Sequence, residues 1–484
     1  MPFLLAVCAA IEEFTAAATA RDPEVFRPRG VDLCYVVERH HYFAMVNDEG
    51  LYRLFVAKRE GTPCPRRLPA MAENFAPYLV KGWRPRGHWR RKLLRGWRGP
   101  RWRASRDQFR KQGAAKVRAE DILPGAPVLF LAVQAKFVRF LLPIAEALGR
   151  PYAFVAFEDP EVYAYLEKEN LPRIHVTFDD PTRELLKVEE FGLLEFYSTY
   201  LNAVVSALKA LDPPCIVVPE GNSPLNELFN RAGHTLSIPT ACIQQGWSPV
   251  VHNGFRNMSF DRMCVWGNGF AELLAPFNPN QKFVATGNHL VAPRPRGDDR
   301  ENGPIAFFLQ AGGSPLITQA AASALLELVV WAAERFPNRQ IRVREHPNAP
   351  LAREDLARLA GAANVRLMPS RDASLEQVMA GCDIAVSIFS STILEAAAAG
   401  IIPLIVNVAG LPHYSPDIAR DGAAIEVKDF EMARAALVRL DEDLDYAASL
   451  AAALDTVKTR YFARDALPAI VAEIQNLCTG VPPG

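Results

Sequence analysis

Two short polar clusters in the last third of the chain have side chains that suit phosphate binding. His346 and Pro347 come just after a predicted strand, residues 340–344. An apolar stretch, residues 383–386, is followed by four hydroxyl side chains: Ser387, Ser390, Ser391 and Thr392. An imidazole and a hydroxyl can each donate a hydrogen bond to a phosphate oxygen. The two clusters therefore predict a site for a phosphate-bearing ligand.

His346 has the chemistry to act on such a ligand as well as to bind it. Its imidazole titrates near neutral pH. A hydrogen-bond donor fixed at a departing phosphate stabilises the negative charge that builds up on the phosphate oxygen. The structural alternatives are a histidine that closes a strand and a serine that caps the following helix. Both stay open, although four hydroxyls are more than one helix cap requires.

Small residues and a positive charge lie close to these clusters in the sequence. Gly312, Gly313 and Ser314 follow another apolar stretch, and small residues allow backbone N–H groups to approach a phosphate. The same residues also suit a tight turn. Arg344, directly before the histidine cluster, adds positive charge.

The segments that carry these residues alternate between strand and helix patterns. From residue 127, apolar runs such as PVLFLAV and CIVVPEG alternate with amphipathic stretches, as in βαβ units around a parallel sheet. A stretch rich in proline, glycine and charge interrupts the alternation once. We therefore predict an α/β protein with two Rossmann-like parallel-sheet domains. The predicted parts are residues 121–290 and 304–429 for the domains, 291–303 for the linker, and 430–484 for C-terminal helices.

Residues 1–120 form a predicted N-terminal extension with a basic end. We expect a helix over residues 4–18, and two strands, in DLCYVVERHHYFAMV and GLYRLFVAK, joined by a turn at residues 47–50. Residues 81–118 hold 15 Lys and Arg against the single acid Asp107, with tryptophans between them. This composition suits an anionic membrane surface. The alternative is a solvated loop packed on the body, and we expect no nucleic-acid partner.

Length and composition are those of a multi-domain globular protein. The chain has 484 residues, of which 50% are hydrophobic and 22% charged, and its net charge is zero. We expect no membrane span, and no cleaved signal peptide because Glu12 and Glu13 interrupt the apolar start. The eight cysteines form no C-x-x-C pair, so we expect reduced thiols. The predicted location is cytoplasmic, with peripheral attachment to the inner face of the cell membrane.

The predicted architecture resembles that of the GT-B glycosyltransferases over most of the chain beyond residue 120. The clusters look most like those of bacterial sialyltransferases, polysialyltransferases and capsule Kdo transferases, in which an HP motif and a downstream serine motif hold the CMP phosphate. His346 and Pro347 match the HP motif, and Ser390 and Ser391 match the paired serines. The resemblance implies that the second domain binds the nucleotide sugar and the first the acceptor. The implied donor-binding residues are Gly312, Gly313, Ser314, Arg344, His346, Pro347, Ser387, Ser390, Ser391 and Glu395, the last on the ribose hydroxyls.

Glycosyl transfer also needs a base that removes the proton of the acceptor hydroxyl, and Glu220 is our first choice. Glu220 ends the buried strand CIVVPEG just before Gly221, so we expect it at the binding edge of the sheet. Partial burial there would raise its pKa toward neutrality. The resembled sialyltransferases carry two acids before this glycine, and here Pro219 replaces the first. An acid that caps the next helix is the structural alternative.

The run IQQGWSPVVHNGF is a second candidate surface in the first domain. Gln244, Gln245 and Trp247 are candidates for sugar binding, and His252 for an alternative base. Glycerophosphotransferases of teichoic acid synthesis share the architecture but carry a histidine where Gln245 stands, which argues against that class. HExxH, Walker A and G-x-S-x-G patterns are absent from the sequence, so zincin, P-loop and serine esterase chemistry have no support.

The leading hypothesis is an inverting, metal-independent glycosyltransferase. It would transfer an acidic sugar, such as Kdo or a nonulosonate of the sialic acid type, from a CMP-activated donor to a bacterial surface glycan or glycolipid. We expect no cofactor apart from this nucleotide-sugar donor. The alternatives are an enzyme like UDP-N-acetylglucosamine 2-epimerase, a UDP-sugar hexosyltransferase, and an inactive GT-B scaffold at the membrane. The sequence leaves the linkage and the oligomeric state open.

Overall fold

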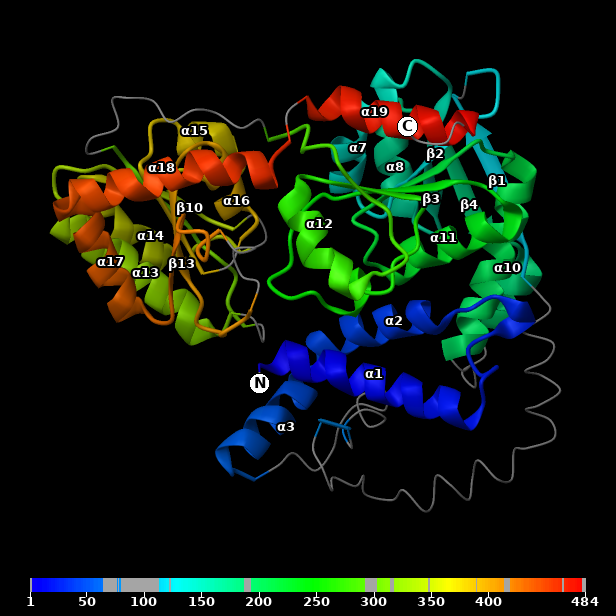
Figure 1. Cartoon of the computed structure of the whole chain (residues 1–484), viewed down its shortest axis with the longest axis horizontal. Helices are drawn as coiled ribbons and strands as arrows, with labels where there is room; N and C mark the ends of the chain where they lie inside the picture. Colours follow the sequence, from blue (N-terminus) through cyan, green and yellow to red (C-terminus); the bar gives the residue numbers. More distant parts are fainter. Residues whose placement is uncertain are drawn as a thin grey trace.

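The computed structural model describes the chain in several stretches, which contain two sheets flanked by helices (Figure 1). The described residues are 2–63, 76, 78–79, 113–121, 123–186, 193–291, 303–313, 317–346, 349–388, 390–412, 418–463 and 465–480. Most of the predicted basic segment and of the predicted linker lies outside them.

The first sheet has eight strands in the order β1-β4-β3-β2-β5-β6-β7-β8. They are β1 (Ala115–Glu120), β2 (Val128–Leu131), β3 (Tyr152–Phe157), β4 (Arg173–Phe178), β5 (Ile216–Pro219), β6 (Thr240–Ile243), β7 (Arg262–Val265) and β8 (Phe283–Ala285). Neighbouring strands are parallel, except that β1 is antiparallel to β4. Strands β2, β5, β6 and β7 are buried throughout, as continuous apolar runs predict for a parallel sheet covered on both faces. The strand order reverses between β2 and β5.

Helices connect most of these strands. They are α7 (Ala135–Ala147), α8 (Pro160–Lys168), α9 (Asp180–Leu186), α10 (Leu193–Leu211), α11 (Pro224–Leu236) and α12 (Asn268–Leu274), with short 3-10 turns η2 (Asn253–Phe255) and η3 (Ala275–Phe277). Ser223 caps α11 because its hydroxyl accepts a hydrogen bond from the backbone N–H of Asn226. Helix α11 therefore starts only a few residues after the end of β5, where Glu220 lies.

The second sheet has six parallel strands in the order β11-β10-β9-β12-β13-β14. They are β9 (Ile305–Phe308), β10 (Ile341–Arg344), β11 (Val365–Leu367), β12 (Ile384–Ser387), β13 (Ile402–Val406) and β14 (Ile425–Val427). The helices between them are α13 (Gln319–Arg335), α14 (Arg353–Ala360), α15 (Leu375–Met379) and α16 (Thr392–Ala398). Here the strand order reverses between β9 and β12, and ligands bind at such reversals in open parallel sheets.

Three C-terminal helices close the chain: α17 (Phe430–Glu442), α18 (Leu444–Tyr461) and α19 (Ala466–Thr479). Helices α17 and α18 pack on the second sheet's strands and helices, whereas α19 returns to the first sheet and packs on α7 (Figure 1). Gln475 donates a hydrogen bond from Nε2 to the carbonyl of Leu148 over 3.0 Å, and Glu473 pairs with Arg262 at 3.1 Å. The end of the chain therefore links the two sheets.

The N-terminal extension is helical, so the two predicted strands are wrong. Its elements are α1 (Phe3–Arg21), the 3-10 turn η1 (Pro28–Gly30), α2 (Cys34–Val46) and α3 (Glu49–Glu60). Buried side chains of α2 recur at Val37, His41 and Met45, which is the period of a helix. The residues predicted as a turn instead hold the cap of α3, because Asp48 accepts a hydrogen bond from the N–H of Leu51.

The extension is anchored to the first sheet's helices by a buried ion pair. Nη1 of Arg39 in α2 lies 2.6 Å from Oε2 of Glu227 in α11, and neither side chain is exposed. Nε of Arg39 donates to the carbonyl of Gly254 over 3.2 Å. Removing one partner of such a pair would leave a buried charge uncompensated, at a cost of about 3–5 kcal/mol. Helices α1 and α2 therefore belong with the first sheet and its helices, which together we call the first unit. The second sheet and its helices form the second unit.

Helix α1 is also apolar. By length and composition it is the one helix among the described residues that would suffice to cross a membrane, although half of that stretch is buried against the protein. A core helix meets the same criterion.

Candidate functional site

The predicted phosphate clusters emerge from neighbouring strand ends of the second sheet. In the strand register, Arg344 of β10 and Ser387 of β12 both pair with Phe308 of β9. Strands β9, β10 and β12 therefore end at the same position along the sheet. The segments that follow them all begin at the same edge of the sheet. This edge includes the reversal between β9 and β12.

His346 lies half-buried just past the end of β10. Its carbonyl accepts a hydrogen bond from the N–H of Ala349 over 3.0 Å. Burial lowers the pKa of the imidazole below its ordinary value, which favours the neutral ring. A neutral imidazole has one N–H, and such a group can donate a hydrogen bond to a phosphate oxygen. Pro347, the other half of the predicted motif, lies outside the described residues.

The predicted serines have three different roles. Ser387 is buried, and its hydroxyl donates to the carbonyl of Phe308 over 3.1 Å, so it ties β12 to β9 and is not placed for a ligand. Ser390 accepts a hydrogen bond from the N–H of Thr392 at the start of α16. Ser391 begins that helix and makes no capping bond with its side chain.

Glu395 and Arg344 interact electrostatically at this edge. Burial raises the pKa of the Glu395 carboxyl to about 7, and the nearby Arg344 guanidinium opposes that rise. Burial in turn lowers the pKa of Arg344, and Glu395 opposes that change. Nη1 of Arg344 donates to the carbonyl of Ala373 over 2.7 Å. Arg344 and Glu395 therefore influence each other's pKa, and Glu395 lies on the first turn of α16.

The predicted glycine turn follows β9. A Cβ atom on Gly312 would lie 2.6 Å from Oε1 of Gln319, at the start of α13. Gly313 has a φ of 94°, in the region that favours glycine, and no atom lies within 4 Å of its Cβ position. The turn is thus close-packed on one side and open on the other. Ser314 lies outside the described residues.

Glu220 has an uncommon backbone conformation at the end of β5. Its φ is 60°, in the left-handed region, which non-glycine residues rarely adopt. Its N–H donates to the carbonyl of Ile243 over 2.8 Å, and the N–H of Gly221 donates to that of Pro219 over 2.7 Å. Such a conformation costs on the order of 1–3 kcal/mol and is concentrated at functional sites. Glu220 directly follows β5, one of the two strands at the reversal between β2 and β5.

Three neighbours surround this carboxylate, and the sequence alone pointed to none of them. Asn222 donates from Nδ2 to Oε2 of Glu220 over 2.9 Å. A Cβ on Gly246 would lie 2.9 Å from Oε1. Burial raises the pKa of Glu220, while the charge of Lys136 and hydrogen bonds from Asn222 and the backbone of Gly246 oppose the rise. Lys136 follows β2, the other strand at the reversal, and this position is the signal that could have identified it.

The predicted sugar-binding residues of the first unit are only partly accessible. Gln244 is buried, and its side chain accepts from the N–H of Trp266 over 3.0 Å and donates to the carbonyl of Gly246 over 3.0 Å. It therefore shapes the loop beside Glu220 and does not face a ligand. Gln245 and Trp247 are half-buried in that loop, and the Trp247 ring lies 5.2 Å from that of Phe270.

His252, the alternative base, is buried. Its Nδ1 accepts a hydrogen bond from the N–H of Gly254 over 2.9 Å, and its ring stacks on Tyr42 with centroids 4.1 Å apart. Burial, together with the smaller effect of the charges of Arg39 and Arg256, lowers the pKa of the imidazole to about 3. These contacts give His252 a structural part in joining α2 to η2, and they leave Glu220 as the better candidate.

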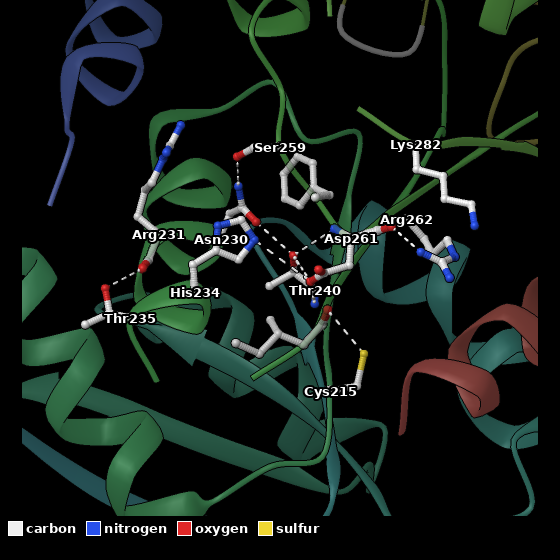
Figure 2. A network of polar contacts seen from close by, with 12 residues as sticks. Cys215, Asn230, Arg231, His234, Thr235, Thr240, Ser259, Asp261, Arg262 and Lys282 are labelled. Atoms are coloured by element: carbon white, nitrogen blue, oxygen red, sulfur yellow. Dashed lines mark hydrogen bonds and ion pairs between the residues drawn. The ribbon is translucent and has the colours of Figure 1, made fainter. Parts of the chain in front are cut away.

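A separate polar network lies at the opposite edge of the first sheet (Figure 2). Asp261, just before β7, accepts a hydrogen bond from the N–H of Thr240, the first residue of β6, over 2.8 Å. The Thr240 hydroxyl donates to Oδ1 of Asn230, and Nδ2 of Asn230 donates to Ser259. Because these residues satisfy one another at the amino ends of the strands, the network joins α11 to the sheet and is not part of the candidate site.

The acids of the C-terminal helices also have structural partners. Asp441 pairs with Arg339 at 3.0 Å, and Asp443 caps α18 by accepting from the N–H of Tyr446. In the part of the chain that the structure describes, no three His, Cys, Asp or Glu side chains form a group that could hold a metal ion.

Comparisons with known proteins identify the fold. The chain matches no protein-family model. No curated protein matches it in sequence. Among solved structures, it is similar to a protein described as a UDP-N-acetylglucosamine 2-epimerase from Listeria monocytogenes, with 15% identity, coverage of 75% of this chain and 99% of the other, and a TM-score of 0.52. It is also similar to MurG of Acinetobacter baumannii, with 15% identity, coverage of 73% and 100%, and a TM-score of 0.51.

A third similar structure is another UDP-N-acetylglucosamine 2-epimerase, with 13% identity, coverage of 75% and 98%, and a TM-score of 0.50. At these identities the likeness concerns the fold alone. The protein has the predicted GT-B fold, with two parallel-dominated sheets and flanking helices. About a quarter of this chain lies outside each of these matches.

Proposed function

We propose that the protein is an inverting glycosyltransferase that uses a nucleotide-sugar donor and Glu220 as its base. The observation that carries the proposal is the left-handed Glu220 at the strand reversal of the first sheet, with a pKa raised by burial. Strain and a perturbed pKa at one strand end are typical of a functional group. A carboxylate with a raised pKa is the better proton acceptor near neutral pH.

In the proposed reaction, Glu220 accepts the proton of the acceptor hydroxyl while that oxygen attacks the anomeric carbon of the donor. The bond from this carbon to the phosphate oxygen breaks on the opposite face, which inverts the configuration. Negative charge builds up on the leaving phosphate, where the N–H of His346 and the hydroxyl of Ser391 would donate hydrogen bonds. Glu395 would accept hydrogen bonds from the ribose hydroxyls.

For the donor we propose a CMP-activated acidic sugar of the Kdo or nonulosonate type, transferred to a bacterial surface glycan. The support is the sequence pattern of His346, Ser390 and Ser391 and their level placement at one edge of the second sheet. We further propose that the enzyme works at the inner face of the cell membrane. The basic, tryptophan-rich composition of residues 81–118 supports this location.

A UDP-N-acetylglucosamine 2-epimerase is the second candidate, because two of the similar folds belong to proteins described in this way. An epimerase converts its nucleotide sugar without an acceptor. Incubation with the donor alone separates the candidates: an epimerase releases an isomerised sugar, whereas a transferase needs an acceptor for efficient turnover.

The first experiment compares thermal unfolding with CMP, UDP and GDP. A ligand at 100 times its dissociation constant stabilises the folded state by about 2.7 kcal/mol, which raises the melting temperature measurably. Selective stabilisation by CMP supports the acidic-sugar donor. Selective stabilisation by UDP favours the epimerase or a UDP-sugar hexosyltransferase. No response to any nucleotide contradicts the proposal and favours an inactive scaffold.

A further inference from the structure

Gln244 fastens the loop that approaches Glu220 to the next strand of the first sheet. It directly follows β6, and its carbonyl and its side-chain Oε1 each accept a hydrogen bond from Trp266, over 2.9 and 3.0 Å. Its Nε2 donates to the carbonyl of Gly246 over 3.0 Å. The Gln244 side chain is only 4% exposed, so these bonds are shielded from water and are stronger for that reason.

Gly246 is the part of this loop that contacts the carboxylate. The backbone of Gly246 forms a hydrogen bond with Glu220, and a Cβ at this position would lie 2.9 Å from Oε1. Asn222 donates to the other oxygen, Oε2, over 2.9 Å. One oxygen is therefore held by a side chain, and the other lies against a backbone segment whose position depends on Gln244.

Trp266 connects this arrangement to the segment between α18 and α19. It directly follows β7 and is 1% exposed. Its carbonyl accepts a hydrogen bond from the N–H of Ala463 over 2.7 Å, and its ring stacks on that of Phe462 with centroids 6.0 Å apart. A Cβ on Gly267 would lie 2.5 Å from the carbonyl oxygen of Arg460, so the two backbones pack without room for a side chain.

The segment between α18 and α19 is where the chain returns from the second unit to the first. Helix α18 packs on β13 and α16 of the second unit, and α19 packs on α7 of the first (Figure 1). Hydrogen bonds therefore lead from Ala463 through Trp266 and Gln244 to Gly246, which contacts Glu220.

We propose that Trp266 and Gln244 are positioning residues, through which the segment between α18 and α19 holds the carboxylate of Glu220 in place. The inference rests on the proposed role of Glu220 as the base. Because the interior is close-packed and these polar groups are buried, a displacement of Ala463 changes the position of Gly246 and weakens its contact with the carboxylate. Trp266 and Gln244 thus act through Glu220 and not on the substrate.

The first test is Gln244→Met, which keeps the approximate volume of the side chain and removes its hydrogen bonds. With a weaker bond from Gly246, the charged form of Glu220 is less favoured and its pKa rises, so the acidic limb of the kcat profile moves to higher pH. We expect kcat to fall about tenfold at pH 6 and less at pH 8, with the KM for the nucleotide sugar unchanged.

Asn278→Leu is the matched control. Asn278 is a similarly buried amide of the first unit, and its Nδ2 donates to the backbone carbonyls of Phe255 and Leu274. This variant should lower the melting temperature, as Gln244→Met does, and leave the pH profile as in the wild type. If the two variants have the same pH profile, Gln244 serves the fold alone and the proposal is wrong.

Ala463→Pro tests the link to the segment between α18 and α19. The proline removes the N–H that donates to Trp266, and Phe462 already has an extended conformation, with φ −134° and ψ 99°, that a residue before proline can adopt. We expect a smaller change of the pH profile in the same direction as in Gln244→Met. A wild-type profile in folded Ala463→Pro would overturn the link. Trp266→Phe, which removes the bond from Nε1 to Gln244, gives the same readout should Gln244→Met not fold.

An NMR titration of the isotope-labelled Glu220 carboxyl, assigned by its loss in Glu220→Gln, measures the effect without turnover. A titration that moves to higher pH in Gln244→Met supports the positioning role, and in a chain that transfers no sugar this result removes the transferase alone. If the wild type transfers sugar and Gln244→Met leaves the Glu220 titration unchanged, the positioning role alone is wrong.

Discussion

Asn222 donates a hydrogen bond from Nδ2 to Oε2 of Glu220 over 2.9 Å, and so fixes one oxygen of the carboxylate. The bond favours the charged form of Glu220 and lowers its pKa, whereas burial raises it. The balance decides the pH at which Glu220 can accept a proton. Asn222 thus acts through Glu220, as a positioning residue.

Asn222→Ala should shift the pH dependence of transfer. Without the hydrogen bond the pKa of Glu220 rises further, so the acidic limb of the rate profile moves to higher pH. We expect a greater loss of kcat at pH 6 than at pH 8. Asn222→Ser keeps a hydrogen-bond donor, so its kcat at pH 6 should lie between those of Asn222→Ala and the wild type. An equal loss at every pH would mean that Asn222 serves the fold alone.

Glu220→Gln should abolish transfer while leaving nucleotide binding intact. The amide cannot accept the proton, and loss of a general base lowers rates by about 10²–10⁴-fold. The measurement is kcat together with the melting shift produced by the nucleotide. Glu161→Gln, at an exposed site on α8, is the control and should behave as wild type. Retained turnover in Glu220→Gln would exclude Glu220 as the base.

Gly246→Ala should lower activity without lowering stability. The added Cβ would lie 2.9 Å from Oε1 of Glu220, the end of a flexible side chain that can move away. The carboxylate is then displaced from its proton-accepting position, and a small misplacement can lower rates about 10²-fold. Gly361→Ala is the matched control, because its Cβ meets its nearest atom at an ordinary 3.4 Å. A folded Gly246→Ala enzyme with normal kcat would contradict the assigned geometry.

Glu395→Gln should change stability in a pH-dependent way. The folded-state pKa of about 7 lies above the ordinary 4.5. The stability contributed by proton uptake is therefore complete below pH 4.5 and lost as pH rises through 7. The neutral variant should match wild type near pH 4.5 and exceed it at pH 8 by at most about 3 kcal/mol. Denaturant unfolding at pH 4.5 and pH 8 measures the free energy of unfolding of both proteins. An equal difference between the variant and the wild type at the two pH values would refute the prediction.

The two neighbouring serines should separate stability from nucleotide affinity. Ser390→Ala removes an acceptor for the N–H of Thr392, so we expect it to lower the free energy of unfolding by about 0.5–2 kcal/mol. Ser391→Ala removes no capping bond and should leave stability unchanged while weakening nucleotide binding. Melting curves with and without the nucleotide report both quantities. If neither variant weakens nucleotide binding, the phosphate does not bind at these serines.

The regular part of the fold is predictable because its signals are local. Apolar runs of four to six residues between amphipathic segments identify strands such as β2, β5 and β12, and parallel strands buried on both faces need just such runs. Short strands with mixed burial, such as β8 and β14, do not carry this pattern, and the sequence did not predict them. The helices α2 and α3 were predicted as strands because their β-branched and aromatic residues outweighed a helical burial period that depends on α11 as a partner.

The sequence by itself determined the alternation of strands and helices and the strand ends at which Glu220, His346 and the serines stand. Those features follow from local hydrophobic periodicity and from the rule that polar residues after parallel strands meet at one edge. The tertiary structure alone decided that Ser387, Gln244 and His252 turn inward, because their partners, Phe308, Trp266 and Tyr42, lie on other elements. It also decided the left-handed turn at Glu220 and the hydrogen bonds that lead to it from Ala463, since each depends on contacts between residues far apart in the chain.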